Sequence, residues 1–287
     1  MVREVGTVIL SGKAMVAGVM GWPVGHSRSP RLHGWWLESY GIDGTYIPLP
    51  VPPDRFEQAL RALPALGLKG CNITVPHKEA ALRAVDRVDP AARRIGAVNT
   101  VVVLPDGSLE GRNTDGFGFL ENLREGAPEW RGEHGPAVVV GAGGAARAVI
   151  VALQDAGVPE IRLVNRTRER AEELAADLGD RITVLPWEWR AKALDGAALL
   201  VNTTTQGMAG HPALDLDLGR LPLTAIVNDI VYTPLMTPLL LEAKRRGCQV
   251  VDGIGMLLHQ ARPGFQAWFG LAPQVTPELR RFILEGL

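Results

Sequence analysis

The chain contains 287 residues, of which 46% are hydrophobic and 21% are charged, and this composition excludes an intrinsically disordered, collagenous or coiled-coil protein. Its 30 basic and 31 acidic residues leave a formal net charge of -1, which argues against a protein built to bind nucleic acid or an anionic membrane and favours a small-molecule ligand. The length suggests two domains.

Cysteine content and hydropathy indicate the compartment. Cys71 and Cys248 are too few for a disulfide framework or a cysteine zinc site, so we expect small buried residues in a reducing environment. No uninterrupted apolar run reaches the roughly 18 residues of a membrane-spanning helix. Glu4, Gly6 and Lys13 interrupt the apolar stretches near the N-terminus, so no signal peptide is predicted. Together these features predict a cytoplasmic protein.

The first half of the chain mixes short apolar runs with helical patterns. Helices are predicted near Pro30, after Asp54 as an N-cap, and from Asp89-Pro90, where Pro takes the first helical position and Gly96 follows the end. Turn residues 105–108 predict a β-hairpin between the last two strands of this half. The predicted strands are residues 15–21, 71–75, 98–104 and 109–112.

After a polar segment at residues 125–136, which we interpret as a linker or loop, the pattern becomes regular. Apolar strands are predicted at residues 137–140, 161–164, 182–185, 198–201, 225–230 and 249–251. Helical patterns alternate with them at residues 145–156 and 168–178, and a further helix is predicted to be capped by Thr237-Pro238 and to stop at Gly247. The segment from Ile254 onward is helical and aromatic. Such alternation requires parallel strands joined by crossover helices, so the predicted fold class is α/β with a doubly wound sheet.

The first strand of this regular half runs directly into a glycine-rich turn and a helix. Gly141 permits the tight turn, Gly143 lets backbone amides approach a pyrophosphate, and Ala146 takes the place of a third glycine where helix and strand pack closely. We predict a Rossmann-type dinucleotide site, with the phosphate at the N-terminus of the helix. The alternative is a tight strand-to-helix connection without a ligand. The residues of the turn are Gly141, Ala142, Gly143, Gly144 and Ala145.

The end of the second strand indicates which dinucleotide is bound. An NAD site normally has an acidic residue there for the ribose 2′-hydroxyl, but this chain has Asn165, Arg166 and Thr167, followed by Arg170. Two guanidinium groups can bind a 2′-phosphate, and Arg166 can stack on adenine. The alternative is that the charges at residues 168–172 form a solvated helix face. We predict NADP(H) as the cofactor.

Further polar motifs lie at the ends of apolar strands: GHSRSP at residues 25–30, NITVPHK at 72–78, AVNT at 97–100 and GRNTDGFGF at 111–119. With GAGGAA at residues 141–146, N-R-T-x-x-R at 165–170 and DGIGMLLHQ at 252–260, the chain resembles the shikimate dehydrogenase family from about residue 15 to residue 270. The resemblance implies a substrate domain at residues 1–114, completed by a C-terminal helix within 254–287, and an NADP domain at 115–253. It also implies that the substrate binds between the two domains, and that NADPH reversibly reduces 3-dehydroshikimate to shikimate in aromatic amino acid biosynthesis.

By resemblance, Lys78 and Asp115 match the catalytic pair of the family. An ammonium group can protonate the carbonyl oxygen as hydride reaches the carbon, and Asp115 would hold Lys78 by a charge-assisted hydrogen bond. Which of the two carries the proton at each step stays open, because coupled groups titrate together. An ordinary Lys–Asp surface pair is the alternative.

The resemblance also implies which side chains hold the two ligands. A polyhydroxylated acid needs several uncharged donors and acceptors, although a serine before proline can instead cap a helix, and Asn99 can instead stabilise a strand end. The substrate carboxylate would be bound by Ser27, Ser29 and Tyr232, and its ring hydroxyls by Thr74, Asn99 and Gln260, beside Lys78 and Asp115. For the cofactor the resemblance adds Thr203, Ile230, Gly253 and Met256.

Other interpretations stay open from the sequence. A quinate or dual quinate/shikimate dehydrogenase, often NAD-linked, would share most of these motifs. A nucleotide-sensing protein without turnover would keep the glycine-rich turn but would not need Lys78 and Asp115 together with the serine pair. We expect a monomer or homodimer whose partner is the small-molecule substrate, and neither nucleic acid nor membrane.

A few residues remain outside these motifs. The histidines show no metal-ligand spacing, so no metal is expected, and Trp35, Trp36, Trp187 and Trp189 are expected to be packing residues. Gly34 stands where the family commonly has asparagine, and Pro263 should kink the final helix.

Overall fold

The computed structural model describes residues 9–179 and 181–285, and these residues form two compact units. The first unit contains the described residues up to Arg93, Ala97–Asn113 and the residues from Ala261 onward. The second contains Arg94–Gly96 and Thr114–Gln260, apart from residue 180. Most of the N-terminal stretch, for which no signal peptide is predicted, lies outside the described residues.

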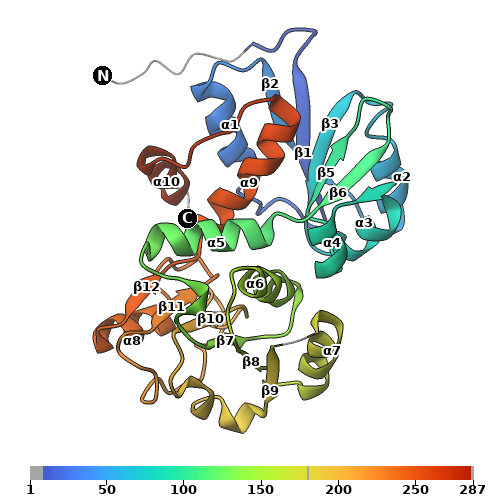
Figure 1. Ribbon diagram of the computed structural model, residues 1–287. Coiled ribbons are helices and arrows are strands. Elements are labelled where there is room, and N and C mark those ends of the chain that lie inside the picture. Colours follow the sequence, from blue (N-terminus) through green and yellow to red (C-terminus); the bar gives the residue numbers. More distant parts are fainter. Residues whose placement is uncertain (1–8, 180, 286–287) are drawn as a thin grey trace. The chain divides into compact units, whose positions relative to one another are not determined.

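The first unit is built on a six-stranded sheet in the order β2-β1-β3-β5-β6-β4 (Figure 1). β1 is parallel to both β2 and β3, whereas β3, β5 and β6 are antiparallel neighbours and β4 is parallel to β6. The strands are β1 (Met15–Gly21), β2 (Gly44–Pro50), β3 (Leu68–Ile73), β4 (Arg87–Val88), β5 (Thr100–Val103) and β6 (Leu109–Arg112).

Helices cover both faces of this sheet (Figure 1), and apolar side chains are buried beneath them. On one face α2 and α3 cover a cluster that contains Phe56, Leu60 and Cys71. On the other face α1 and α9 bury aromatic side chains, among them Trp36 and Phe265, whose ring centroids lie 5.2 Å apart. The helices of this unit are α1 (Ser29–Ser39), α2 (Phe56–Arg61), α3 (Lys78–Ala84), α4 (Pro90–Ile95), the later part of α9 (Ile254–Phe269), and α10 (Pro277–Leu284).

Several sequence predictions for this unit are confirmed. β1 has the predicted bounds, and the β5–β6 hairpin turns at Asp106, whose Oδ1 accepts a hydrogen bond from the Ser108 amide at 3.0 Å. α4 begins at Pro90, with Asp89 Oδ1 accepting from the Ala92 amide at 2.5 Å. Both cysteines are buried and unpaired.

Two local predictions are wrong. Asp54 does not cap a helix: it lies in the 3-10 turn Pro53–Arg55, and α2 begins one residue later without a side-chain cap. β3 spans Leu68–Ile73 rather than residues 71–75, because pairing with β1 begins at Leu68. The chain turns at Thr74, whose carbonyl accepts from the His77 amide at 2.9 Å, and Val75 is 70% exposed.

The second unit contains an all-parallel sheet in the order β12-β11-β10-β7-β8-β9. Numbered within the unit, this order is 6-5-4-1-2-3, the doubly wound arrangement of Rossmann folds. Predicted and observed strands differ by at most one residue at each end. The strands are β7 (Ala137–Val140), β8 (Ile161–Val164), β9 (Ile182–Leu185), β10 (Leu199–Asn202), β11 (Ile226–Asp229) and β12 (Gln249–Val251).

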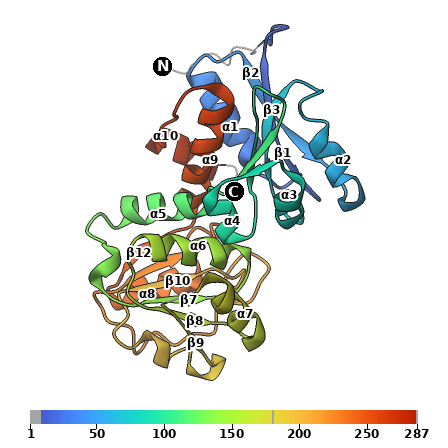
Figure 2. The same ribbon diagram turned by 45° about the vertical axis from the view of Figure 1, so that its right-hand side comes forward.

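Helices cover both faces of this second sheet. α5, α6 and α7 form one layer, in which α5 lies beside α6 (Figure 1, Figure 2). α8 covers a buried apolar cluster on the other face, and as predicted it is capped by Thr237, whose Oγ1 accepts from the Leu240 amide at 3.3 Å. The helices are α5 (Asp115–Gly126), α6 (Gly144–Asp155), α7 (Arg168–Leu178) and α8 (Pro238–Arg246).

The helix α5 corrects the reading of residues 125–136 as a loop throughout, since α5 reaches Gly126 and a 3-10 turn follows at Gly132–His134. Its glycines serve close packing: a Cβ at Gly118 would lie 2.6 Å from the Cβ of Gln260. α9 continues through Pro263. Among the described residues, no helix combines the length and apolarity needed to cross a membrane.

Candidate active site

A cavity of about 370 Å³ lies at the carboxyl ends of strands in the second unit. It sits where the strand order reverses between β7 and β10, the usual ligand-binding position in a doubly wound sheet. Four connections contribute to its wall, the segments after β7, β8, β9 and β10. The lining residues are Val140, Gly141, Ala142, Gly143, Asn165, Arg166, Arg170, Trp187, Thr203, Thr204, Thr205 and Gln206.

The glycine-rich turn forms one side of this cavity. Gly141 has φ 110°, and a Cβ there would lie 2.7 Å from Thr203 Oγ1, so only glycine fits. α6 begins at Gly144, and its N-cap residue Gly143 provides no side-chain hydrogen bond. The first amides of α6 are therefore available to an anion such as a pyrophosphate, as the sequence motif predicts.

Two arginines supply positive charge to the same cavity. Arg168 forms an ion pair with Glu172 at 2.7 Å, so the solvated helix face does account for that residue. In the described part of the chain, neither Arg166 nor Arg170 has a carboxylate within ion-pair distance, and no carboxylate lines the cavity. Unpaired guanidinium groups at a cavity wall favour binding of a phosphate dianion.

A buried carboxylate organises the connections after β10 and β11. Asp229 Oδ1 accepts from Asn202 Nδ2 and from the Val231 amide, both at 3.0 Å, and Oδ2 accepts from Thr237 Oγ1 at 2.7 Å. Burial raises the pKa of Asp229 from 3.8 to about 6, although the hydrogen bond from Thr237 acts in the opposite direction. Asn202 Oδ1 in turn accepts from the amide of Thr204, which lines the cavity.

This network around Asp229 was missed by sequence reasoning. A signal existed in the polar residues that end two adjacent buried strands, Asn202 on β10 and Asp229 on β11. Because buried polar groups need partners, a polar pair at neighbouring strand ends indicates a hydrogen-bonded junction.

Only some of the predicted cofactor residues line the cavity. Gly141, Ala142, Gly143, Asn165, Arg166, Arg170 and Thr203 line it, whereas Gly144, Ala145, Thr167, Ile230, Gly253 and Met256 are not among its lining residues in the described part of the chain. Ile230 and Gly253 are neighbours, because a Cβ at Gly253 would lie 2.3 Å from the Ile230 carbonyl oxygen. Thr167 is the N-cap residue of α7.

In the first unit, the predicted substrate residues lie at one edge of the sheet. The ends of β1 and β3 meet there, since a Cβ at Gly21 would lie 2.4 Å from the Thr74 methyl group. Ser27 Oγ accepts from the amide of Ser29, the first residue of α1, at 3.3 Å. Lys78 is the first residue of α3, and its carbonyl accepts from the Val98 amide at 3.0 Å.

A buried hydrogen-bond chain lies behind Asn99. Tyr46 Oη donates to Asn72 Oδ1 at 2.6 Å, and Asn72 Nδ2 donates to the Asn99 carbonyl and to Thr100 Oγ1, each at 3.1 Å. Thr100 Oγ1 donates to Asn99 Oδ1 at 2.9 Å. Burial raises the pKa of Tyr46 well above 10.0, so its hydroxyl remains a donor. His33 stacks on the Tyr46 ring at 3.9 Å, and burial lowers its pKa to about 3.

The other predicted substrate residues belong to the second unit. Asp115 begins α5, and Gln260 lies on α9, where its Nε2 donates to the Leu257 carbonyl at 3.1 Å. α5 and α9 touch closely at Gly118 and Gln260. Tyr232 follows β11 in the connection that Asp229 holds through Val231.

Histidines and tryptophans take varied positions. Within the described ranges, no group of three His, Cys, Asp or Glu side chains could hold a metal ion, and His259 Nε2 instead lies 2.7 Å from Glu125 Oε2. Trp36 packs in the core as predicted. Trp189 does not, because it is 50% exposed.

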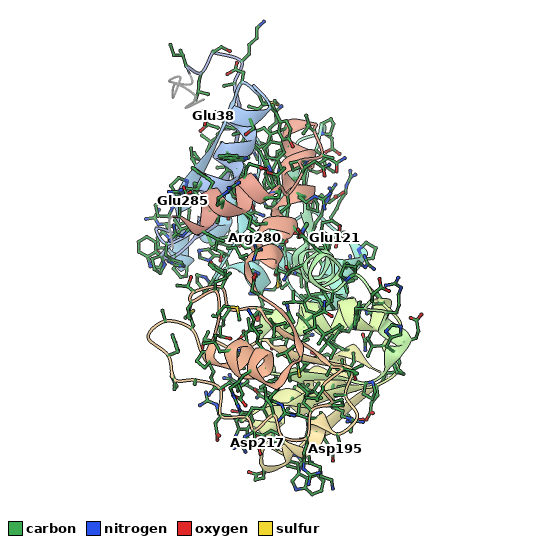
Figure 3. All side chains as sticks on the ribbon, turned by 90° about the vertical axis from the view of Figure 1, so that its left-hand side faces the viewer. Glu38, Glu121, Asp195, Asp217, Arg280 and Glu285 are labelled. Atoms are coloured by element: carbon green, nitrogen blue, oxygen red, sulfur yellow. The ribbon has the colours of Figure 1, made fainter. Side chains whose placement is uncertain are left out.

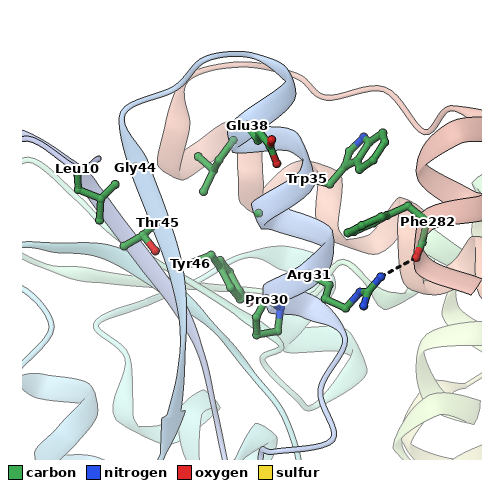
Figure 4. Close-up of a pocket in the computed structure, with 11 residues that line it drawn as sticks. Leu10, Pro30, Arg31, Trp35, Glu38, Gly44, Thr45, Tyr46 and Phe282 are labelled. Carbon is green, nitrogen blue, oxygen red and sulfur yellow. Dashed lines mark hydrogen bonds between the residues drawn. The ribbon is translucent and has the colours of Figure 1, made fainter. Parts of the chain in front are cut away.

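A second cavity, of about 410 Å³, lies in the first unit between α1, β2 and Phe282 of α10 (Figure 4). Arg31 connects its two helical walls: Nη2 donates to the Phe282 carbonyl at 2.9 Å, and the guanidinium carbon lies 4.3 Å from the Phe282 ring centroid. A Cβ at Gly34 would meet nothing within 4 Å among the described atoms. The described lining residues of this cavity include none of the predicted site residues, so it takes no part in the candidate site.

These features define an α/β protein with a Rossmann-type unit, in which two arginines line a cavity at the position where such folds bind dinucleotides. Family models agree with this class: "Shikimate dehydrogenase substrate binding domain" matches residues 19–101 and "Shikimate / quinate 5-dehydrogenase" matches residues 131–209. The chain belongs to the shikimate dehydrogenase family.

Individual relatives cover almost the whole chain. The shikimate dehydrogenase (NADP(+)) of Paramagnetospirillum magneticum is 66% identical over 275 residues, which are 96% of this chain and 100% of that protein. The structure of Thermus thermophilus shikimate 5-dehydrogenase in complex with NADP(H) and shikimate has a TM-score of 0.84 at 40% identity, covering 95% of this chain and 100% of that one. Quinate dehydrogenase from Corynebacterium glutamicum in complex with NAD has a TM-score of 0.88 at 32% identity, with coverages of 95% and 99%.

Proposed function

We propose that this chain catalyses the reversible NADPH-dependent reduction of 3-dehydroshikimate to shikimate, a step of aromatic amino acid biosynthesis. The choice of NADP as cofactor is supported by two arginines, Arg166 and Arg170, which line the nucleotide cavity. The 66% identical relative named shikimate dehydrogenase (NADP(+)) supports both cofactor and substrate. The reaction consumes one hydride from NADPH and one proton, and releases NADP⁺.

We assign substrate binding to residues 1–114 together with 254–287, and cofactor binding to residues 115–253. The polar side chains at the strand ends of the first unit support the first assignment. The glycine-rich turn and the cavity around it support the second.

The cofactor side of the site divides into three regions. Arg166 and Arg170 take the 2′-phosphate, with Asn165 and Thr167 shaping the connection between them and β8. The amides of Gly143, Gly144 and Ala145 at the start of α6 take the pyrophosphate. The nicotinamide end is held by Thr203, Ile230, Gly253 and Met256, and when bound it supplies the hydride.

The substrate is held mainly by uncharged groups. Ser27, Ser29 and Tyr232 take the carboxylate, and Thr74, Asn99 and Gln260 take the ring hydroxyls. The buried chain from Tyr46 through Asn72 and Thr100 fixes the amide of Asn99 before substrate arrives. Holding a polar group in place in advance lowers the ordering cost of binding.

Lys78 and Asp115 handle the proton. As hydride reaches the carbonyl carbon, negative charge develops on the oxygen, and the Lys78 ammonium both stabilises that charge and donates the proton. In the reverse direction the neutral amine accepts the hydroxyl proton of shikimate. In this proposal Asp115 holds Lys78 by a charge-assisted hydrogen bond.

The decisive experiment measures kcat/KM with shikimate and with quinate, each with NADP and with NAD. We expect the highest value for shikimate with NADP. The similarity to a quinate dehydrogenase crystallised with NAD makes quinate the second candidate, and a highest value for quinate with NAD would establish it instead. NADP binding without turnover of either acid would refute the catalytic function and favour a nucleotide sensor.

We further propose a cytoplasmic enzyme that acts as a monomer or homodimer. The buried, unpaired Cys71 and Cys248 fit a reducing compartment. Size-exclusion chromatography with light scattering gives the mass in solution, to be compared with the 30.9 kDa of one chain. A mass above two chains would refute this assignment.

A further inference from the structure

Trp187 forms an aromatic wall of the nucleotide cavity. It begins the 3-10 turn Trp187–Trp189, which follows β9, and it lines the same cavity as Arg166 and Arg170. Its side chain packs against the buried cluster beneath α8, but the residue remains half-buried. The prediction that Trp187 is a packing residue therefore describes only part of its environment, because the indole also borders the cavity.

The indole is fixed in place before any ligand binds. The Arg190 guanidinium carbon lies 4.9 Å from the centroid of the indole ring, and Arg190 Nη1 donates to the Trp187 carbonyl at 3.1 Å. Arg190 is itself held by Asp215, donating to its carbonyl and to its carboxylate at 2.6 Å each. Because the side chain is already ordered, little conformational entropy is lost when a ligand packs on it.

The two kinds of wall define the chemistry of the ligand. Arg166, Arg170 and the start of α6 bind anions, whereas Trp187 offers a flat aromatic surface. A ligand that satisfies both carries phosphates and a planar ring, and aromatic side chains stack on any nucleobase. We propose that Trp187 binds the adenine ring of the dinucleotide, and this rests on the proposed function, which makes the dinucleotide the ligand of this cavity.

Trp189 provides a matched control in the same turn. It is 50% exposed, it is not among the described residues that line the cavity, and Lys192 Nζ lies 4.8 Å from its ring centroid. Replacing either tryptophan removes an indole from the same 3-10 turn. Of the two, Trp187 lines the cavity, so a loss of binding specific to its replacement reflects the cavity wall.

The first measurement is calorimetric titration of adenosine 2′,5′-bisphosphate into the wild type, Trp187→Leu, Trp187→Phe and Trp189→Leu. Loss of one base–aromatic stack should raise the Kd of Trp187→Leu by about 5- to 100-fold. We expect Trp187→Phe to stay within about threefold of the wild type because it keeps an aromatic face, and Trp189→Leu to remain unchanged. Equal affinity in wild type and Trp187→Leu would overturn the proposal.

Two further readouts separate stacking from damage to the fold. Adenosine 2′,5′-bisphosphate should quench tryptophan emission in the wild type and in Trp189→Phe, and quench it much less in Trp187→Phe. Turnover with reduced nicotinamide mononucleotide, which lacks adenine, should be the same in Trp187→Leu and wild type, whereas kcat/KM for NADPH falls. Equal losses with both reductants would assign Trp187 a structural role. Failure of the wild type to bind the bisphosphate would instead refute the proposed nucleotide cavity.

Discussion

Asp229 is expected to make the stability of the protein depend on pH, in the direction opposite to that of a salt-bridged carboxylate. Its side chain is fully buried, and burial raises its pKa from 3.8 to about 6. A tenfold change in an ionisation constant corresponds to 1.36 kcal/mol, so ionised Asp229 lowers the free energy of unfolding by about 3 kcal/mol relative to an unperturbed carboxyl. The folded state binds more protons than the unfolded state between these pKa values, so the stabilising contribution of protonated Asp229 is fully present below about pH 4 and is lost as the pH rises through 6.

The variant Asp229→Asn isolates this effect. The amide keeps the shape of the side chain and one acceptor for Asn202 and Val231, and the Thr237 hydroxyl can turn to accept from the new NH₂ group. Because asparagine does not titrate, the free energy of unfolding of Asp229→Asn should increase relative to that of the wild type as the pH rises. About 1.4 kcal/mol of this shift falls between pH 5 and pH 7.5.

Urea unfolding followed by far-UV circular dichroism at pH 5, 6, 7 and 7.5 measures this difference. Asp217→Asn is the control for losing one negative charge, because Asp217 is exposed at the surface of the second unit and accepts only from the Gly219 amide, at 2.8 Å, among the described residues (Figure 3). A constant difference between Asp229→Asn and wild type across this range would refute the raised pKa. The same pH-dependent difference in Asp217→Asn would show that net charge, and not burial, is responsible.

Three other substitutions test the site and its scaffold. Lys78→Ala should lower kcat by roughly 10²- to 10⁴-fold with a smaller change in KM, in steady-state assays with shikimate and NADP; an unchanged kcat with a raised KM would make Lys78 a binding residue. Arg166→Ala and Arg170→Ala should each lower kcat/KM for NADP by about tenfold or more and affect NAD much less, at fixed ionic strength; equal losses with both cofactors would refute the 2′-phosphate assignment. Gly34→Ala should raise the free energy of unfolding by about 0.5 to 1 kcal/mol, because Gly34 lies inside α1 and an added methyl group would meet no described atom within 4 Å; a lower melting temperature would contradict this.

The second unit was predictable to within a residue at most strand ends. Buried parallel strands are short, continuous apolar runs, and turn residues end them sharply, so β7, β8, β9 and β12 have their predicted bounds. The helix caps carry equally local signals, as at Thr237 with Pro238. At Asp54 the local signal is misleading. Asp54 lies in the 3-10 turn Pro53–Arg55, so Arg55, one residue later, takes the N-cap position of α2.

The candidate site was predictable where function depends on backbone geometry or on charge type. Gly141 and Arg166 were identified in this way, because a tight turn requires glycine and a phosphate requires cations. The contribution of Trp187 was not found, because a tryptophan after a strand has the same local pattern whether it packs inward or borders a cavity. Asp229 was missed for a related reason: its partners Asn202 and Thr237 are determined by strand order, which local patterns do not give.

The helix α5 shows how the position of a proposed catalytic residue depends on contacts far along the chain. Two glycines in its first turn disfavour a helix locally, and the sequence around Asp115 predicts only a polar motif at a strand end, with no helix there. In the structure those glycines let other elements approach: a Cβ at Gly116 would lie 3.1 Å from the Ala148 carbonyl oxygen on α6, and one at Gly118 would lie 2.7 Å from the Met256 carbonyl oxygen on α9. Asp115 is the first residue of this helix. The glycines next to Asp115 therefore fix its backbone by close packing, although the same residues in an isolated segment would leave it flexible.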